Sequence, residues 1–352
     1  MQISFGTLEI SQRIKQDSAL MKVHALIDWE GLRGELTGLY KREESRAGGQ
    51  EPIDPLLMFK TVLLGQLHSL SDAKLEDALQ VRIDFIVFCG LGLHENTPDH
   101  STLCRFRNRL INTGKLPKLL AAVNQQLQHH GLMVKQAQGA IVEATLITAA
   151  ARPRNEIRVD ELSSSNAEER ADTPEVSCQQ SACADPDAAW AKKGKRSYFG
   201  YRSHIIVDSD DGYVRGVHST PANESETTQL QAVLSSSDFQ PQRLYADKGY
   251  TSQANRDFLR QHKIKRGIMY KAQRNRPLTS KQRRANKLIA KPRALVERCF
   301  GTVKRLFDMQ RTRYFGTHKI NAQFILKAIC MNLLKAVNKI SLTTPPLQGR
   351  CA

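Results

Sequence analysis

The chain has 352 residues, of which 40 % are hydrophobic and 25 % are charged, and its formal net charge is +17. This length suits about two domains. The sequence shows no signal-peptide pattern and no run of roughly 18–20 apolar residues, so we expect neither secretion nor a membrane partner. The seven cysteines include no Cys-x-x-Cys pair, which argues against a disulfide framework or a zinc site and favours a reducing cytoplasm.

The charge is unevenly distributed along the chain. Residues 263–313 contain seventeen Lys or Arg and only two acids, whereas residues 153–187 contain nine acids and three Arg. A basic chain without membrane signals most often binds nucleic acid. The acidic stretch has few large apolar residues and no periodicity, so we expect residues 153–187 to form a flexible insertion.

The first third of the chain predicts helices. Asp54-Pro55 begins an apolar helix over residues 56–67, Ser71 begins a second, and Asp99 begins a third over residues 100–112. Arg105 and Arg109 share one face of the third helix. This order is compatible with a helix-turn-helix-like unit that contacts DNA, and also with an ordinary bundle whose arginines are solvated. We therefore expect residues 1–135 to form a helical N-terminal domain.

The remainder alternates strands and helices. Strands are predicted at residues 140–148, 200–207, 213–219, 243–246 and 264–270, and helices at 226–234, 252–262, 293–309 and 321–338. Residues 271–291 are expected to be a basic linker. The pattern predicts an α/β domain over residues 136–340, with a mixed sheet and flanking helices, followed by a tail at 341–352.

Three acids stand out by position. Glu143 lies within an apolar strand, Asp247 follows another strand, and Glu297 lies on a helix in the most basic part of the chain. A carboxylate in an apolar strand costs free energy unless it has a partner. Carboxylates from separate segments can hold the paired divalent cations that phosphodiester cleavage requires. His204, also on an apolar strand, is expected to be a core histidine rather than a ligand.

Two of these acids stand in segments that resemble a known family. The segments run from Leu244 to Tyr250 around Asp247, and from Arg293 through Glu297 to Lys304. They resemble the second and third motifs of DDE transposases of the insertion-sequence-five group. Further similar segments are Ser4-Phe5-Gly6, residues 98–102, Asp185-Pro186-Asp187, Lys192-Lys193-Gly194 and residues 198–204.

The resemblance covers nearly the whole chain and implies an RNase H-like catalytic domain after an all-α N-terminal DNA-binding domain. It implies that Glu143, Asp247 and Glu297 are the catalytic residues and the ligands of Mg²⁺ or Mn²⁺. Arg293 and Lys304 would contact phosphate, and the N-terminal domain would recognise terminal inverted repeats. The implied partners are double-stranded DNA, as inverted repeats and target, and further copies of the chain in a homo-oligomer on DNA.

Two positions depart from the family pattern. Ala290 stands where the family has Tyr, and Glu143 stands where it has the first Asp. The extra methylene moves the carboxylate by roughly 1 Å, and a misplacement of that size can cost about 100-fold in rate. Asp208 is a poor substitute, because the predicted hairpin places it away from the expected cluster. The hypothesis is that fold and DNA binding survive while catalysis is weakened.

Two other functions fit parts of the pattern. One is a non-catalytic DNA-binding protein derived from a transposase, which the Glu143 departure favours. The other is an RNase H-like nuclease or RNA-binding protein that is unrelated to transposition. All three predict salt-sensitive binding, so only a preference for one terminal sequence over random DNA separates the third function from the two that involve a transposase or its derivative.

Overall fold

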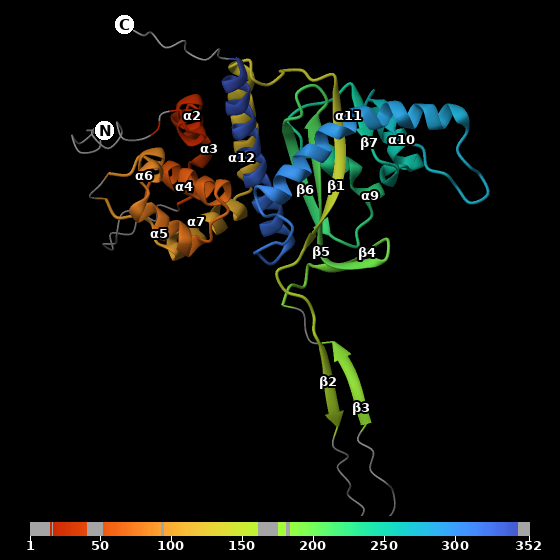
Figure 1. Ribbon diagram of the computed structural model, residues 1–352, viewed down its shortest axis with the longest axis horizontal. Helices are drawn as coiled ribbons and strands as arrows, with labels where there is room; N and C mark the ends of the chain where they lie inside the picture. The colour runs from red at the N-terminus through yellow and green to blue at the C-terminus, as the bar shows by residue number, and fades with distance from the viewer. Residues whose placement is uncertain are drawn as a thin grey trace, which may run out of the picture.

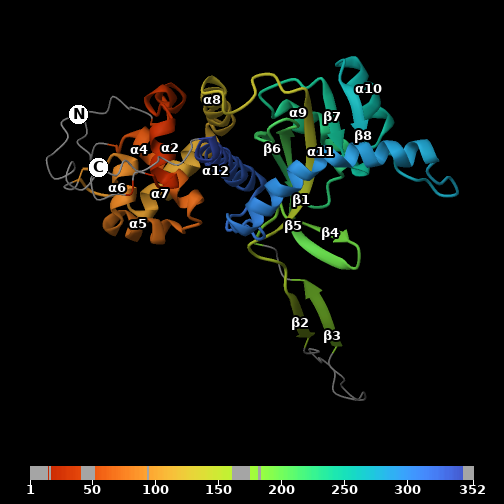
Figure 2. The same cartoon turned by 45° about the horizontal axis from the view of Figure 1, so that its top comes forward.

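The computed structural model describes residue 15 and residues 17–40, 52–92, 95–160, 175–180 and 184–343, and it describes no side chains for 155–160, 175–180 and 341–343. The Ser4-Phe5-Gly6 motif and most of the expected tail lie outside these residues. The N-terminal helices gather at one side of the molecule and the mixed sheet at the other, with α12 (Thr317–Thr343) between them (Figures 1 and 2).

The predicted N-terminal helices are confirmed, and local capping explains where they begin. The side chains of Asp54, Ser71 and Asp99 accept hydrogen bonds from backbone N–H groups of the first turns of α4, α5 and α7. A short helix, α6, was not predicted; it ends at Gly90, whose φ is 80°. The helices described in the N-terminal region are α2 (Ala19–Leu26), η1 (Glu30–Leu32), α3 (Arg33–Leu36), α4 (Pro55–Leu67), α5 (Asp72–Val81), α6 (Ile83–Cys89), α7 (His100–Asn112) and α8 (Leu116–His129).

The sheet of the second region has the order β4-β5-β1-β7-β8, and β6 also pairs with β5. The central strand β1 runs antiparallel to β5 and parallel to β7, which is itself parallel to β8. The strands are β1 (Gly139–Thr148), β4 (Ala189–Lys193), β5 (Arg196–Asp208), β6 (Val214–Pro221), β7 (Arg243–Ala246) and β8 (Lys265–Ile268).

Helices cover both faces of this sheet. Apolar residues of α9 (Glu226–Ser235) and α10 (Gln253–Gln261) pack on one face against Val142, Ile206 and Leu244. On the other face, α11 (Ser280–Arg305) crosses β1 and β7 (Figure 1). The expected mixed α/β, RNase H-like fold is confirmed. In chain order, Glu143 lies on the first strand of this sheet, β1, Asp247 follows the fifth, β7, and Glu297 lies on the later helix α11.

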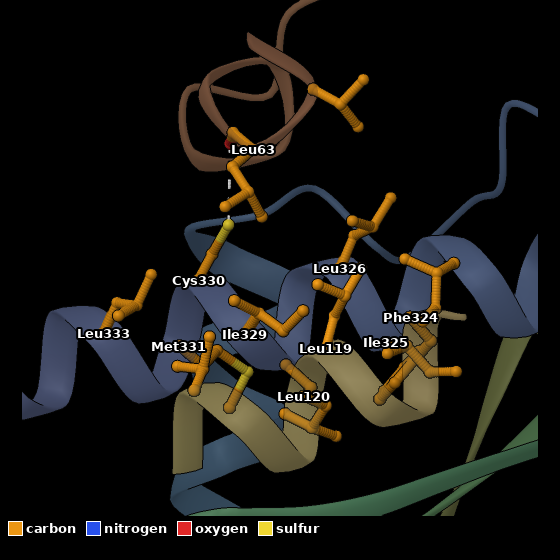
Figure 3. Packing of buried hydrophobic residues seen from close by; sticks show 14 of the residues in the cluster. Leu63, Leu119, Leu120, Phe324, Ile325, Leu326, Ile329, Cys330, Met331 and Leu333 are labelled. Atoms are coloured by element: carbon orange, nitrogen blue, oxygen red, sulfur yellow. Dashed lines mark hydrogen bonds between the residues drawn. The ribbon is translucent and has the colours of Figure 1, made fainter. Parts of the chain in front are cut away.

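The last helix joins the two regions into one core. Leu119 and Leu120 of α8 lie on one side of α12 and Leu63 of α4 on the other, and the Cys330 thiol donates a hydrogen bond to the Leu63 carbonyl (Figure 3). By length and composition alone α12 could cross a membrane, but 83 % of its most apolar window is buried in the protein. Its apolar surface is thus accounted for by packing against α4, α8 and β6.

Two sequence predictions differ from the structure. The expected flexible insertion contains a two-stranded antiparallel sheet, β2 (Asn155–Asp160) with β3 (Glu175–Gln180), which projects from the domain (Figure 1). The expected basic linker is mostly helix, because α11 already begins at Ser280. Pro292 lies inside this helix and removes a bond to the carbonyl of Leu288. Leu288 is 61 % exposed, so water can satisfy that carbonyl.

Candidate active site

Sheet register places Glu143 and Asp247 side by side. Val142 of β1 pairs with Ala246 of the parallel strand β7, so the next residue of each chain lies at the same level. Because side chains alternate along a strand, both carboxylates leave the sheet on the face opposite to Val142 and Ala246. That face is the one covered by α11. Two acids separated by more than one hundred residues therefore meet below one helix.

The guanidinium of Arg293 lies between the two acids. Its Nη2 donates a hydrogen bond to Oε2 of Glu143, and its Nη1 lies 3.5 Å from Oδ1 of Asp247 and 2.9 Å from Sδ of Met269. The side chains of Arg293 and Glu143 are only 14 % and 16 % exposed, and that of Asp247 is 30 % exposed. Arg293 therefore neutralises a half-buried pair of carboxylates that would otherwise repel one another.

The pKa shifts reflect the same convergence. Burial raises the pKa of Glu143, while the hydrogen bond and charge of Arg293 oppose that rise. Burial works to lower the pKa of Arg293, but the hydrogen bond to Glu143 and the charges of Glu143, Asp247 and Glu297 outweigh it and raise the pKa. Glu143 and Asp247 thus pair with one guanidinium, and the charge of Glu297 adds to their effect on its pKa.

Glu297 and Lys304 extend the site along α11. Spacings of four and seven residues put Arg293, Glu297 and Lys304 on one helical face. Glu297 is exposed, and it has no hydrogen bond or ion pair with any residue that the structure describes. Burial lowers the pKa of Lys304, with a further contribution from the charge of nearby Lys193. Lys193, at the end of β4, is a second cation here that spacing on α11 could not reveal.

The donor set suits a hard divalent cation only in part. Glu143 and Asp247 present carboxylate oxygens, which Mg²⁺ and Mn²⁺ prefer. Within the described part of the chain, no group of three or more His, Cys, Asp or Glu is gathered closely enough to hold a metal ion. Glu143 and Asp247 are the two proposed ligands that lie close together. Glu297, the third, lies one helical turn beyond Arg293.

The loop that carries Asp247 is held from the other face of the sheet. The backbone oxygen of Tyr250 accepts a hydrogen bond of 2.7 Å from Asn255, and that of Gly249 accepts one of 2.8 Å from Thr227. A Cβ on Gly249 would lie 2.1 Å from a carboxylate oxygen of Glu226, so a larger residue there would displace the Glu226 side chain. Glu226 in turn forms an ion pair of 2.5 Å with Arg202. Sequence reasoning missed these residues, because their contacts are set by the packing of α9 on the sheet.

His204 belongs to the same layer and is a core histidine, as predicted. It is fully buried, and its Nδ1 lies 2.7 Å from the Tyr250 hydroxyl. Burial lowers the pKa of His204 to about 3, with smaller effects from the charges of His218 and Arg202. No metal-ligating role is needed to explain its position.

This histidine predicts a pH dependence of stability. Its folded-state pKa lies below its unfolded value, so the unfolded chain binds the proton first as the pH falls. The stability associated with neutral His204 is present above about pH 6.5 and is lost as the pH falls towards 3. We expect His204→Gln to reduce the slope of unfolding free energy against pH, measured by urea denaturation between pH 4.5 and 6.5, by up to about 1.4 kcal/mol per pH unit. The exposed His129→Gln should leave the slope as in wild type; equal slopes for all three proteins would refute the prediction.

Asp208 has a structural role, in line with its exclusion from the predicted ligand set. Its buried carboxylate accepts hydrogen bonds from the backbone N–H groups of residues 210–213, at 2.6 to 3.2 Å. These bonds fix the turn between β5 and β6. With both carboxylate oxygens committed to the turn, Asp208 does not replace the first acid of the site.

In the N-terminal region, Arg105 and Arg109 both line a groove of about 870 Å³ between α7, α4 and the first helices. Arg105 donates hydrogen bonds of 3.1 and 3.0 Å to Ser101 and Thr102, and Arg109 lies 5.2 Å from the ring centre of Tyr40. Both arginines are exposed, and neither forms an ion pair with an acid among the described residues, although the charge of Arg105 acts on nearby Asp99. Their charge is therefore available to an anionic ligand.

Two family models and a named relative are similar to this chain. A family model described as "Transposase DDE domain" matches residues 135–333, and one described as "Transposase domain (DUF772)" matches residues 8–109. The chain is 42 % identical, over 238 residues, to a protein named "Transposase for insertion sequence element IS1106" from Neisseria meningitidis serogroup B. This match covers 67 % of the chain and 78 % of that relative. No solved structure matches.

Proposed function

The chain belongs to the family of transposases with a DDE domain, and we propose that it moves an insertion sequence by divalent-metal-dependent cleavage and strand transfer at the ends of the element. The reaction would take place on chromosomal DNA in the bacterial cytoplasm. The observation that carries the proposal is the pairing of Glu143 and Asp247 with the guanidinium of Arg293, with Glu297 one helical turn further along α11.

Each residue of the site has a role that fits this reaction. Glu143, Asp247 and Glu297 would hold Mg²⁺ or Mn²⁺, which supplies an activated water or hydroxyl and stabilises the leaving oxygen. Arg293 is a planar donor that is suited to carboxylate and phosphate alike. With the carboxylates neutralised by the cation, its guanidinium would be free to bind the phosphate next to the scissile bond. Lys304 and Lys193 add positive charge on the side towards the end of α11.

We further propose that the helical N-terminal region recognises the terminal inverted repeats through α7. Arg105 and Arg109 supply exposed positive charge on one face of this helix. The third arginine of the helix, Arg107, is unsuited to this role because it is buried and pairs with Asp72 at 2.6 and 2.8 Å. Because each element has two ends, the active complex is expected to contain at least two copies of the chain.

The test uses a labelled duplex that carries the terminal repeat of the element and a shuffled duplex of the same composition. We expect tighter binding of the repeat by at least about tenfold, and cutting at its end in Mg²⁺ or Mn²⁺ but not in EDTA. Arg105→Gln with Arg109→Gln should remove the preference, whereas Lys118→Gln with Lys135→Gln should retain it. Equal binding of both duplexes would reject repeat recognition and favour the unrelated RNase H-like nuclease or RNA-binding alternative.

The second candidate function is that of a DNA-binding protein derived from a transposase but without catalysis. The observation that favours it is Glu143, whose longer side chain forms the hydrogen bond to Arg293. It predicts specific binding of the repeat without cutting, in either metal. Cleavage by the wild-type protein would exclude this candidate, and cleavage by the Glu143→Asp protein alone would support it.

A further inference from the structure

One strongly charged surface is not used by the proposed site. We define the basic arm as residues 271–291, which comprise the loop after β8 and the first part of α11. The chain has no Asp or Glu between Asp257 and Glu297. The arm carries eight cationic side chains, all exposed: Lys271, Arg274, Arg276, Lys281, Arg283, Arg284, Lys287 and Lys291. None of the eight has an ion pair or a side-chain hydrogen bond with any residue in the described part of the chain.

The arm is an ordered element rather than a loose linker. Thr279 and Gln282 form a reciprocal capping box, with bonds of 3.2 and 3.0 Å, that begins α11. The Asn286 amide bonds both the N–H and the carbonyl of Tyr270, at 2.8 and 3.1 Å, and so ties the helix to the chain after β8. Figures 1 and 2 both show the start of α11 and the preceding loop extending past β7 and α10.

An ordered group of cations without ion pairs favours a ligand of opposite charge. Self-repulsion along one helix costs stability, which bound phosphates would offset. The same helix carries Arg293 and Glu297, so the arm is in line with the candidate active site. At about 1.5 Å per residue, Lys287 and Lys281 lie roughly 9 and 18 Å from Arg293 along the helix axis. At about 3.4 Å per base pair this spans phosphates about three to five base pairs from the reacting one.

We propose that the basic arm binds the phosphate backbone of duplex DNA next to the cleaved bond, without reading its sequence. The proposal rests on the proposed function for the place of the reacting phosphate. It goes further in assigning a second DNA contact, on a different surface from Arg105 and Arg109. Three polar side chains of the arm, Thr279, Gln282 and Asn286, are engaged in hydrogen bonds within the protein. The arm therefore presents mainly Lys and Arg charges, which suit phosphate oxygens.

The test compares two triple variants that each remove three positive charges. The arm variant is Arg283→Gln, Arg284→Gln and Lys287→Gln; the control is Lys118→Gln, Lys135→Gln and Lys319→Gln, at exposed sites elsewhere. Binding to a duplex without the terminal repeat is measured from 50 to 200 mM NaCl in EDTA, so no cleavage is required. For the arm variant we expect about tenfold weaker binding at 50 mM and a decrease of about two to three in the slope of log K against log salt.

The ratio of affinities for repeat and random duplex should stay unchanged in the arm variant, because phosphate contacts carry no sequence information. Circular dichroism and Tm confirm that both variants fold. The assignment would be overturned if the arm variant bound duplex DNA as the control does. It would also be overturned if the arm substitutions weakened the binding of single-stranded RNA as much as that of duplex DNA. Since binding is measured without metal, a failure here is distinct from a failure of the proposed catalysis.

Discussion

Replacing Asp247 with Asn is expected to reduce metal-dependent cleavage of the element end by at least about 1,000-fold while the fold is retained. The amide has the same shape as the carboxylate but lacks the charge that a divalent cation requires. Although Asp247 precedes the short helix η2, its side chain makes no capping hydrogen bond there. The turn itself is held by Asn255 and Thr227. Apart from its ion pair with Arg293, the carboxylate therefore has no structural role that Asn would disturb.

The measurement is a single-turnover cleavage rate in Mg²⁺ and in Mn²⁺, together with the Kd for the same duplex and the Tm. Because Glu143 can itself slow the reaction, the substitution is made in wild type and in a Glu143→Asp background. Asp257→Asn, on the exposed side of α10, is the matched control and should cut at the rate of its parent. If Asp247→Asn cut within a few-fold of its parent, the assignment of this acid to the site would be lost.

Much of the fold could be predicted because local signals decide it. Asp54, Ser71 and Asp99 bear the capping side chains that start their helices, and each acts at the predicted position. The β-branched segment around Glu143 and the short segment before Asp247 are strands because their apolar residues are buried on both faces of the sheet. Capping and apolar patterning depend on residues that are close together in the chain, so they can be recognised in the sequence alone.

The remaining features depend on tertiary contacts. The sequence predicted a helix start at Arg293, yet α11 begins thirteen residues earlier, because the capping box at Thr279 and the Asn286 contact with Tyr270 stabilise it. Helical spacing aligned Arg293 with Glu297, but it could not show that Arg293 reaches Glu143. That contact follows from how α11 crosses β1 and β7, which is set by side-chain packing.

Replacing Glu143 with Asp is expected to raise the rate of Mg²⁺-dependent end cleavage by about 100-fold without changing the Kd for the repeat. The longer side chain lets Glu143 form a direct hydrogen bond to Arg293, whereas Asp247 lies 3.5 Å from the same guanidinium. Aspartate would withdraw the carboxylate by roughly 1 Å towards the strand, weaken that bond and bring its oxygens level with those of Asp247.

Rate and affinity separate the two explanations of any gain. A shorter acid that only released Arg293 to bind DNA would lower the Kd, whereas a better placed ligand would raise the rate at saturating protein. Glu143→Gln is the matched control, because it keeps the length of Glu and the contact with Arg293 but removes the charge; it should cut no faster than wild type. If wild type already cut as fast as Glu143→Asp, glutamate would be a competent first ligand. The hydrogen bond to Arg293 would then be a resting-state contact that the cation displaces at no measurable cost in rate.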